Sequence, residues 1–210
     1  GIGMTADEVR KYINQSAFSG AEEFLRKYEG SDEKNTIIGH FGLGFYSAFM
    51  VADTVEVITK SYTGTPAVHW TCTGDGEYET TAGVRDGHGT TVIMHISDEE
   101  SAYLEKYKIQ EILEKYCTFI PVEIYFNCED DATDETKDEE KAAPSPVNDT
   151  TPLWLKNPSD CTPEEYKDFY RKVFHDYKEP LFWIHINADY PLNFRGILYF
   201  PKITNEYESI

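Results

Sequence analysis

The chain has 210 residues, of which 38 are acidic and 19 are basic, so its formal net charge is -19 at pH 7. A charge of this sign repels phosphate backbones, and we therefore expect no nucleic-acid partner. No run of about eighteen apolar residues occurs, which argues against a membrane span. The chain is 40% hydrophobic, enough to bury a core.

The first region of the chain, 1–127, alternates helical and strand signals. Thr5 followed by two acids predicts the start of a helix, because acidic side chains favour the first turn. The run 39–50 is rich in glycine at its start and helical at its end. A further helix is predicted at 21–28, and strands rich in β-formers at 55–62, 67–72, 76–81 and 90–96.

Ser97 and Glu100 have the spacing of a capping box and predict that another helix follows. That helix presents one apolar stripe, and a strand is predicted at 122–126 after it. Together these signals indicate a mixed α/β layer. The stripe consists of Ile109, Ile112, Leu113 and Tyr116.

The composition changes sharply between Cys128 and Pro146, where eight acids and two lysines occur without a large apolar side chain after Cys128. Such a segment cannot bury enough surface to offset its ordering entropy, so it is predicted to be a solvated linker. We therefore predict three parts, with an acidic linker at 128–150 between regions 1–127 and 151–210.

The second region also begins with a capped helix, because Thr162, Pro163 and Glu165 match an N-cap, a first-turn proline and a capping-box acid. Strands follow at 181–187 and 194–200. Some sixty residues of this kind form a poor core alone, which predicts the start of a larger domain. One aromatic helix face is expected from Tyr166, Phe169, Tyr170, Val173 and Phe174.

The four cysteines are scattered and form no CxxC pair, and the six histidines show no HxxxH spacing, so no zinc site is expected. Four unpaired thiols favour a reducing compartment, and we expect a cytoplasmic protein. Two glycosylation sequons, at 14–16 and 148–150, are treated as chance matches. The start at Gly1 shows no initiating methionine or signal segment, which suggests a piece of a longer protein.

Glycine carries the candidate chemistry, since no HExxH, GxSxG or GxxxxGK[ST] motif occurs. Gly39, Gly42 and Gly44 precede a helix, so backbone amides there could hold a phosphate. The alternative is that these glycines only permit a tight loop. The motifs at 1–4 and 87–90 are each weaker.

Taken together and in order, these motifs resemble the heat-shock protein 90 chaperones, in particular those of bacteria. The likeness covers nearly the whole chain outside the acidic stretch. The matching segments are GIGMT (1–5), SGAEEF (19–24), IGHFGLGFYSAFMVAD (38–53), VEVITKS (55–61), GHGTTV (87–92) and PLWLKNPSDCTPEEYKDFYRKVFHDYKEPL (152–181).

The resemblance implies a fold. The family shares its ATP-binding domain with gyrase, MutL and histidine kinases, a mixed-sheet α/β sandwich. Residues 1–127 would be the later, incomplete part of that domain. Residues 128–150 would be the charged linker, and 151–210 the start of an α/β middle domain.

The resemblance also implies a nucleotide site. Gly1 and Gly3 would line the adenine pocket with Met4 on the base, and Thr90 would bond near the adenine through a water. Residues 12–37 would form a lid, where Asn14 replaces a glycine and Phe18 a lysine, while His40 is expected to be a loop residue. The ATP-binding set implied in this way is Gly1, Gly3, Met4, Asn14, Gly20, Gly42, Leu43, Gly44, Phe45 and Thr90.

By the same resemblance the parent protein would be an ATP-dependent, homodimeric stress chaperone that binds partly folded clients. Its general-base glutamate and magnesium-holding asparagine would precede Gly1, and a middle-domain arginine would follow Ile210. We therefore expect ATP and Mg²⁺ as cofactors of the parent, but no catalytic residue, metal ligand or hydrolysis in these 210 residues. Trp154 would either contact clients or fill its own domain.

Two other classes stay open on the sequence. A sensor histidine kinase or topoisomerase subunit would share the ATP fold, but neither would carry segment 152–181 after an acidic linker. A noncatalytic interaction module is the third hypothesis, and nucleotide titration would separate it from the first.

Overall fold

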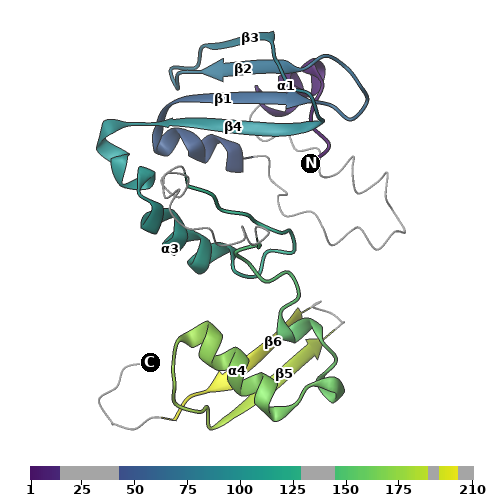
Figure 1. Cartoon of the computed structure of the whole chain (residues 1–210), viewed down its shortest axis with the longest axis vertical. Helices are drawn as coiled ribbons and strands as arrows, with labels where there is room; N and C mark the ends of the chain where they lie inside the picture. The colour runs from purple at the N-terminus through teal and green to yellow at the C-terminus, as the bar shows by residue number, and fades with distance from the viewer. Residues whose placement is uncertain (15–42, 129–144, 189–193, 203–210) are drawn as a thin grey trace, which may run out of the picture. The chain divides into compact units, whose positions relative to one another are not determined.

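The computed structural model describes residues 1–14, 43–128, 145–188 and 194–202 (Figure 1). The chain divides into two compact units, Gly1–Ile112 and Leu113–Ile210. The predictions for 21–28, for the lid beyond residue 14 and for most of the acidic stretch lie outside the described residues. The three-part division predicted from the composition stays a prediction.

The first unit is built on a four-stranded antiparallel sheet in the order β3-β2-β1-β4 (Figure 1). All four strands were predicted within a few residues of their observed bounds. Alternate side chains are buried in β1 from Val55 to Thr59 and throughout β2, whereas every residue of β3 is exposed. The strands are β1 (Ala52–Lys60), β2 (Val68–Cys72), β3 (Tyr78–Ala82) and β4 (Gly89–Ile96).

One face of this sheet carries the core of the unit. The helix α1 (Ala6–Tyr12) begins with the capping box of Thr5 and Glu8, and the buried Val9 packs with the sheet residues. Fully burying a valine-sized side chain stabilises the fold by about 1.5–3 kcal/mol. The buried cluster consists of Val9, Ile13, Ala52, Val55, Val57, Val68, Trp70 and Cys72.

The predicted helix after the glycine motif is present, but as the 3₁₀ helix η2 (Gly44–Met50). Tyr46 N–H donates to the Leu43 carbonyl three residues back, at 3.1 Å. The Ser47 hydroxyl donates to the Gly44 carbonyl at 2.6 Å and so competes for the acceptor that an α-helical turn needs.

The predicted capping box at Ser97 and Glu100 is wrong, because the Ser97 side chain makes no capping hydrogen bond. A 3₁₀ helix, η3 (Asp98–Leu104), begins there instead, and Glu100 N–H donates to the Ser97 carbonyl at 3.0 Å. The α-helix α3 (Lys106–Cys117) follows. Of its predicted stripe the first three members are half-buried, whereas Tyr116 is exposed.

The strand predicted at 122–126 is absent, because a side chain takes the place of a neighbouring strand. The Asn148 Nδ2 group donates to the carbonyls of Ile120 and Val122, and its Oδ1 accepts from Ile124 N–H, each at 2.8 Å. Val147 N–H donates to the Ile124 carbonyl at 2.8 Å. The segments before and after the acidic stretch are therefore held together at its base.

The second unit contains the predicted helix and strands as α4 (Pro163–Phe174), β5 (Phe182–Ala188) and β6 (Phe194–Phe200). The capping box of α4 is formed, with Pro163 in its first turn. Tyr166 and Tyr170 of the predicted aromatic face are buried, whereas Phe174 at its end is exposed. The α4 helix packs on one face of the two-stranded antiparallel sheet (Figure 1).

Aromatic contacts join the helix to this sheet. The Tyr166 ring stacks on Trp183 with centroids 5.0 Å apart, and its hydroxyl lies 2.8 Å from His185 Nδ1. The Tyr199 hydroxyl donates to the Tyr166 carbonyl at 2.8 Å. Burial is the main cause that raises the pKa of Tyr166 to about 12, which agrees with a packed and uncharged phenol. None of the helices in the described ranges is long and apolar enough to span a membrane.

Candidate functional site

The first glycine motif lies against the end of β1. Gly3 has φ +68°, and a Cβ atom on it would stand 1.8 Å from the carbonyl oxygen of Lys60. The Ile2 carbonyl accepts a hydrogen bond from Tyr62 N–H at 2.8 Å. Only glycine fits this left-handed, close-packed position, whereas Gly1 has open space where a side chain would be.

A buried threonine of β1 connects this motif to the third one. The Thr59 hydroxyl accepts from Met4 N–H at 2.9 Å. It also lies 3.2 Å from the Gly89 carbonyl oxygen and 2.8 Å from Thr90 Oγ1. The motifs at 1–4 and 87–90 therefore meet at one end of one strand, although they are more than eighty residues apart.

Two cationic side chains hold the loop of the third motif. Lys60 Nζ donates to the carbonyls of Arg85 and Asp86, at 3.2 and 3.0 Å. The Arg85 guanidinium donates to Thr91 Oγ1 at 2.6 Å, and its Nε is buried without a partner. The predicted contact Thr90 is exposed beside this loop, and Met4 is half-buried on the core.

The second glycine motif is only partly described, since Gly42 lies outside the described residues, as do Gly20, Phe18 and His40. Leu43 is exposed, and a Cβ on Gly44 would meet nothing within 4 Å. Phe45 turns the other way and packs on the core, with its ring 5.6 Å from that of Trp70. Leu43 and Gly44 thus present open backbone, whereas Phe45 has a packing role.

Asn14, which replaces a glycine at the start of the implied lid, does not adopt a left-handed conformation. His175 is the one non-glycine with positive φ among the described residues. The Asn14 side chain is held instead, because its Oδ1 accepts from Trp70 Nε1 at 2.8 Å. Tyr46 Oη donates to the neighbouring Ile13 carbonyl at 2.8 Å.

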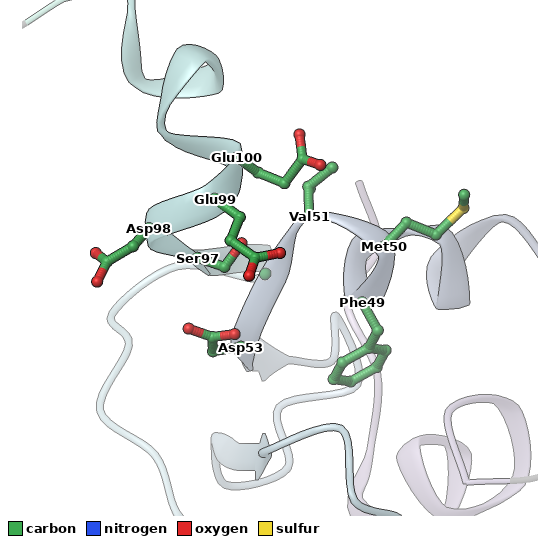
Figure 2. Close-up of a pocket in the computed structure, with 9 residues that line it drawn as sticks. Phe49, Met50, Val51, Asp53, Ser97, Asp98, Glu99 and Glu100 are labelled. Carbon is green, nitrogen blue, oxygen red and sulfur yellow. The ribbon is translucent and has the colours of Figure 1, made fainter.

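A pocket of about 450 Å³ lies elsewhere in the same unit, between the end of η2, the start of β1 and the start of η3. Figure 2 shows the carboxylates of Asp53, Asp98, Glu99 and Glu100 at this pocket, with the Met50 side chain extending away from them. Carboxylates at such density repel a triphosphate, so we do not assign nucleotide to this pocket. It is lined by Phe49, Met50, Val51, Ala52, Asp53, Ser97, Asp98, Glu99 and Glu100.

The opposite face of the sheet carries a polar cluster that the sequence did not suggest. Glu56 of β1 lies 2.6 Å from His69 Nε2 and 2.6 Å from His95 Nε2, one on each neighbouring strand. These hydrogen bonds, the one with His95 first, lower the pKa of Glu56 below its usual value. Within the described ranges no group of three or more His, Cys, Asp or Glu side chains could hold a metal ion.

Trp154 of the second unit lies in the short 3₁₀ helix η5 (Leu153–Leu155) and is half-buried. Its ring packs edge-on against Phe119 and Phe169, with centroids 4.6 and 5.6 Å away. This packing favours the alternative in which Trp154 fills its own domain. Client contact by Trp154 stays a prediction.

Sequence reasoning found the glycine motifs at 1–4 and 87–90 but missed Thr59, the residue that joins them. A threonine in a strand is an ordinary β-former, so the pattern gave no reason to single it out. The available signal was its position, since it follows Val55 and Val57 on the buried face of β1.

Comparison with known proteins relates the chain to one protein family. The model of the Hsp90 protein family matches residues 133–209. Chaperone protein HtpG of Porphyromonas gingivalis strain ATCC 33277 is 51% identical over 209 residues, and that of Bacteroides thetaiotaomicron is 50% identical over 209 residues. HtpG of Sulfurimonas denitrificans is 36% identical over 212 residues.

These alignments cover nearly the whole chain but only part of each relative. They include 99% of this chain for the first two relatives and 96% for the third. The chain spans 30% of the length of the first two and 34% of the third. With its mixed α/β units and antiparallel sheet, the chain belongs to the heat-shock protein 90 family, in the group that includes the bacterial HtpG chaperones.

Proposed function

We propose that this chain carries part of the nucleotide site of an ATP-dependent chaperone, in a sandwich of the gyrase, MutL and histidine-kinase type. The observation that supports it is the meeting of two glycine motifs at the end of β1. There the half-buried Met4 and the exposed Thr90 hydroxyl offer an apolar surface beside a polar edge, which suits a purine base.

The chemistry of the surrounding groups fits ATP. Met4 would pack on the base and Thr90 would hold its polar edge, with Gly1 and Gly3 giving the backbone room. The amides around Leu43 and Gly44 would hold phosphates, and a Cβ position on Gly44 that meets no described atom within 4 Å leaves room for a ligand there. Bound ATP with its Mg²⁺ would supply the free energy of hydrolysis to the whole protein, and the chain's own residues bind and orient it.

The wider functions follow from family membership and are part of the proposal. The whole protein would be a cytoplasmic homodimer that hydrolyses ATP and binds partly folded clients. Residues 1–127 would contribute to the ATP-binding domain, 128–150 would be the linker and 151–210 would open the middle domain. Neither nucleic acid nor a membrane is needed by this function.

The test uses a full-length chimera, in which this sequence replaces the matching region of the P. gingivalis chaperone. Calorimetry should show ADP binding to the chimera. Gly44→Val should weaken binding about 10- to 100-fold, because it blocks backbone that would approach phosphate, while the melting temperature stays unchanged. A chimera that folds but binds no ADP would refute the proposal and favour a noncatalytic interaction module.

Ala102→Val is the matched control for Gly44→Val. Ala102 is exposed in η3 and lies in none of the glycine motifs, so the substitution adds bulk away from the proposed nucleotide site. It should leave ADP affinity within about threefold of the chimera without substitutions. Equal losses in both variants would mean that added bulk on any exposed surface disturbs binding, and the phosphate role of Gly44 would be rejected.

A further inference from the structure

Thr59 is the polar member of a buried apolar row. Its exposed fraction is 0%, as it is for Val55 and Val57 on the same face of β1. A hydroxyl buried without hydrogen bonds costs about 1–3 kcal/mol, so its partners determine whether the fold tolerates it. Here the partners are the two motifs of the proposed nucleotide site.

The three contacts of this hydroxyl permit one assignment in which each of them is a hydrogen bond. Thr59 Oγ1 accepts from Met4 N–H and has one hydrogen of its own to give. If that hydrogen goes to the Gly89 carbonyl, the 2.8 Å contact with Thr90 requires Thr90 to be the donor. This is the assignment in which all three contacts are hydrogen bonds. It directs the Thr90 hydrogen inward and leaves the outer lone pairs of Thr90 free.

We propose that Thr59 is a positioning residue of the nucleotide site, which holds the Met4 backbone and makes Thr90 a hydrogen-bond acceptor toward a base in direct contact with it. The proposal rests on the proposed nucleotide function. An acceptor at this position favours a purine with an amino group at its six-position over one with a carbonyl there. Thr59, which need not touch the base, would then contribute to the choice of adenine.

The test compares ADP with inosine diphosphate, which carries a carbonyl in place of the amino group. Calorimetry on the full-length chimera should show a preference for ADP. Thr59→Val keeps the shape of the side chain but removes the hydroxyl, so the Thr90 hydrogen is free to turn outward and Met4 N–H loses its acceptor. We expect ADP to bind about tenfold more weakly and the preference for ADP to fall by a similar factor.

Two variants separate positioning from packing. Thr59→Ser keeps the hydroxyl and should retain ADP affinity and preference within about threefold. Thr54→Val makes the same change on the same strand but on the opposite face, and should leave both values unaltered. If Thr59→Ser folds but binds as poorly as Thr59→Val, the residue acts through packing and the positioning role is wrong.

A third variant covers the case in which Thr59→Val does not fold. Thr90 is exposed, so Thr90→Val should fold, and the proposal requires it to lose the preference for ADP. Hydrogen exchange at the Met4 amide, measured without nucleotide, should also be faster in Thr59→Val than in Thr59→Ser. An unchanged ADP preference in Thr90→Val refutes the inference while the nucleotide function stands. A chimera that binds neither nucleotide refutes the proposed function itself.

Discussion

Gly3 offers a stringent test of how the first motif is held, through Gly3→Ala. The added methyl group would stand 1.8 Å from the Lys60 carbonyl oxygen, and the residue would keep a φ of +68°. Left-handed strain costs about 1–2 kcal/mol, and forcing an extra methyl into a packed site about 1–3 kcal/mol. The lower entropy of the unfolded alanine chain returns about 0.4–1 kcal/mol. We expect a net loss of about 2–4 kcal/mol.

Three other glycines separate the two causes. Gly1→Ala has neither a contact within 4 Å nor a left-handed φ, and should change little. Gly64→Ala has φ +84° and open space, so it measures strain alone and should cost about 1 kcal/mol. Gly83→Ala would place its methyl 2.7 Å from the Val68 carbonyl carbon without a left-handed φ, so it measures the clash alone.

The assay is native-state hydrogen exchange of the β1 amides in the four variants, because it reports on this unit separately from the other. The loss in Gly3→Ala should exceed the sum of the losses in Gly64→Ala and Gly83→Ala by about 0.4–1 kcal/mol, because that sum counts the stabilisation from the lower entropy of the unfolded alanine chain twice. A Gly3→Ala protein no less stable than Gly64→Ala would show that the turn can move away from β1. The close contact between the two glycine motifs would then not be a fixed feature.

Three further predictions concern the second unit and the acidic stretch. Trp154→Ala should lower the unfolding free energy by about 2 kcal/mol through lost ring packing, measured by urea denaturation; lost client binding at unchanged stability would instead support a docking role. The hydrogen bond from the Lys156 ammonium is the main cause that lowers the pKa of Glu165 from 4.5 to about 2. The ionised Glu165 carboxylate therefore stabilises the folded state above pH 4.5, and this stabilisation is lost as the pH falls toward 2. Glu165→Gln should therefore be less stable than the wild type at pH 7 but not at pH 2 in circular-dichroism melts. Replacing 128–146 with a short Gly/Ser linker should leave the helix signal in circular dichroism unchanged. A loss of helix signal would mean that the acidic stretch supports the structure of the flanking regions.

Local signals in the sequence predicted most of the described fold. Apolar alternation predicted β1, the other strands of the first sheet were predicted from their β-forming residues, and α4 follows from its capping residues and aromatic spacing. The prediction failed at 122–126, where Asn148, more than twenty residues away, satisfies the backbone that a strand would have paired. It also failed at Ser97, where a 3₁₀ turn formed in place of a capped α-helix.

The candidate site was less predictable than the fold, since its residues meet only through tertiary structure. The glycine motifs were each weak alone, and only the family resemblance that they carry together implied Gly3, Met4 and Thr90 as site residues. Nothing local distinguished Thr59, whose role depends on loops that come together at the end of its strand. Asn14 belongs to the ATP-binding set implied by the resemblance, and its side-chain oxygen accepts a hydrogen bond from Trp70, a partner 56 residues away that no local pattern indicates.

The hydrogen bonds by which Asn148 holds together the segments before and after the acidic stretch have a consequence for covalent modification. Its Nδ2 group gives hydrogen bonds to two carbonyls, so a glycan on the sequon 148–150 would take the place of one of these hydrogens. Deamidation would go further, because it replaces the donor group with a carboxylate oxygen facing the same two carbonyls. A single hydrolysed amide would then repel the chain it now holds and open the base of the acidic stretch. Ageing of the polypeptide would thus alter this junction without any change in the encoded sequence.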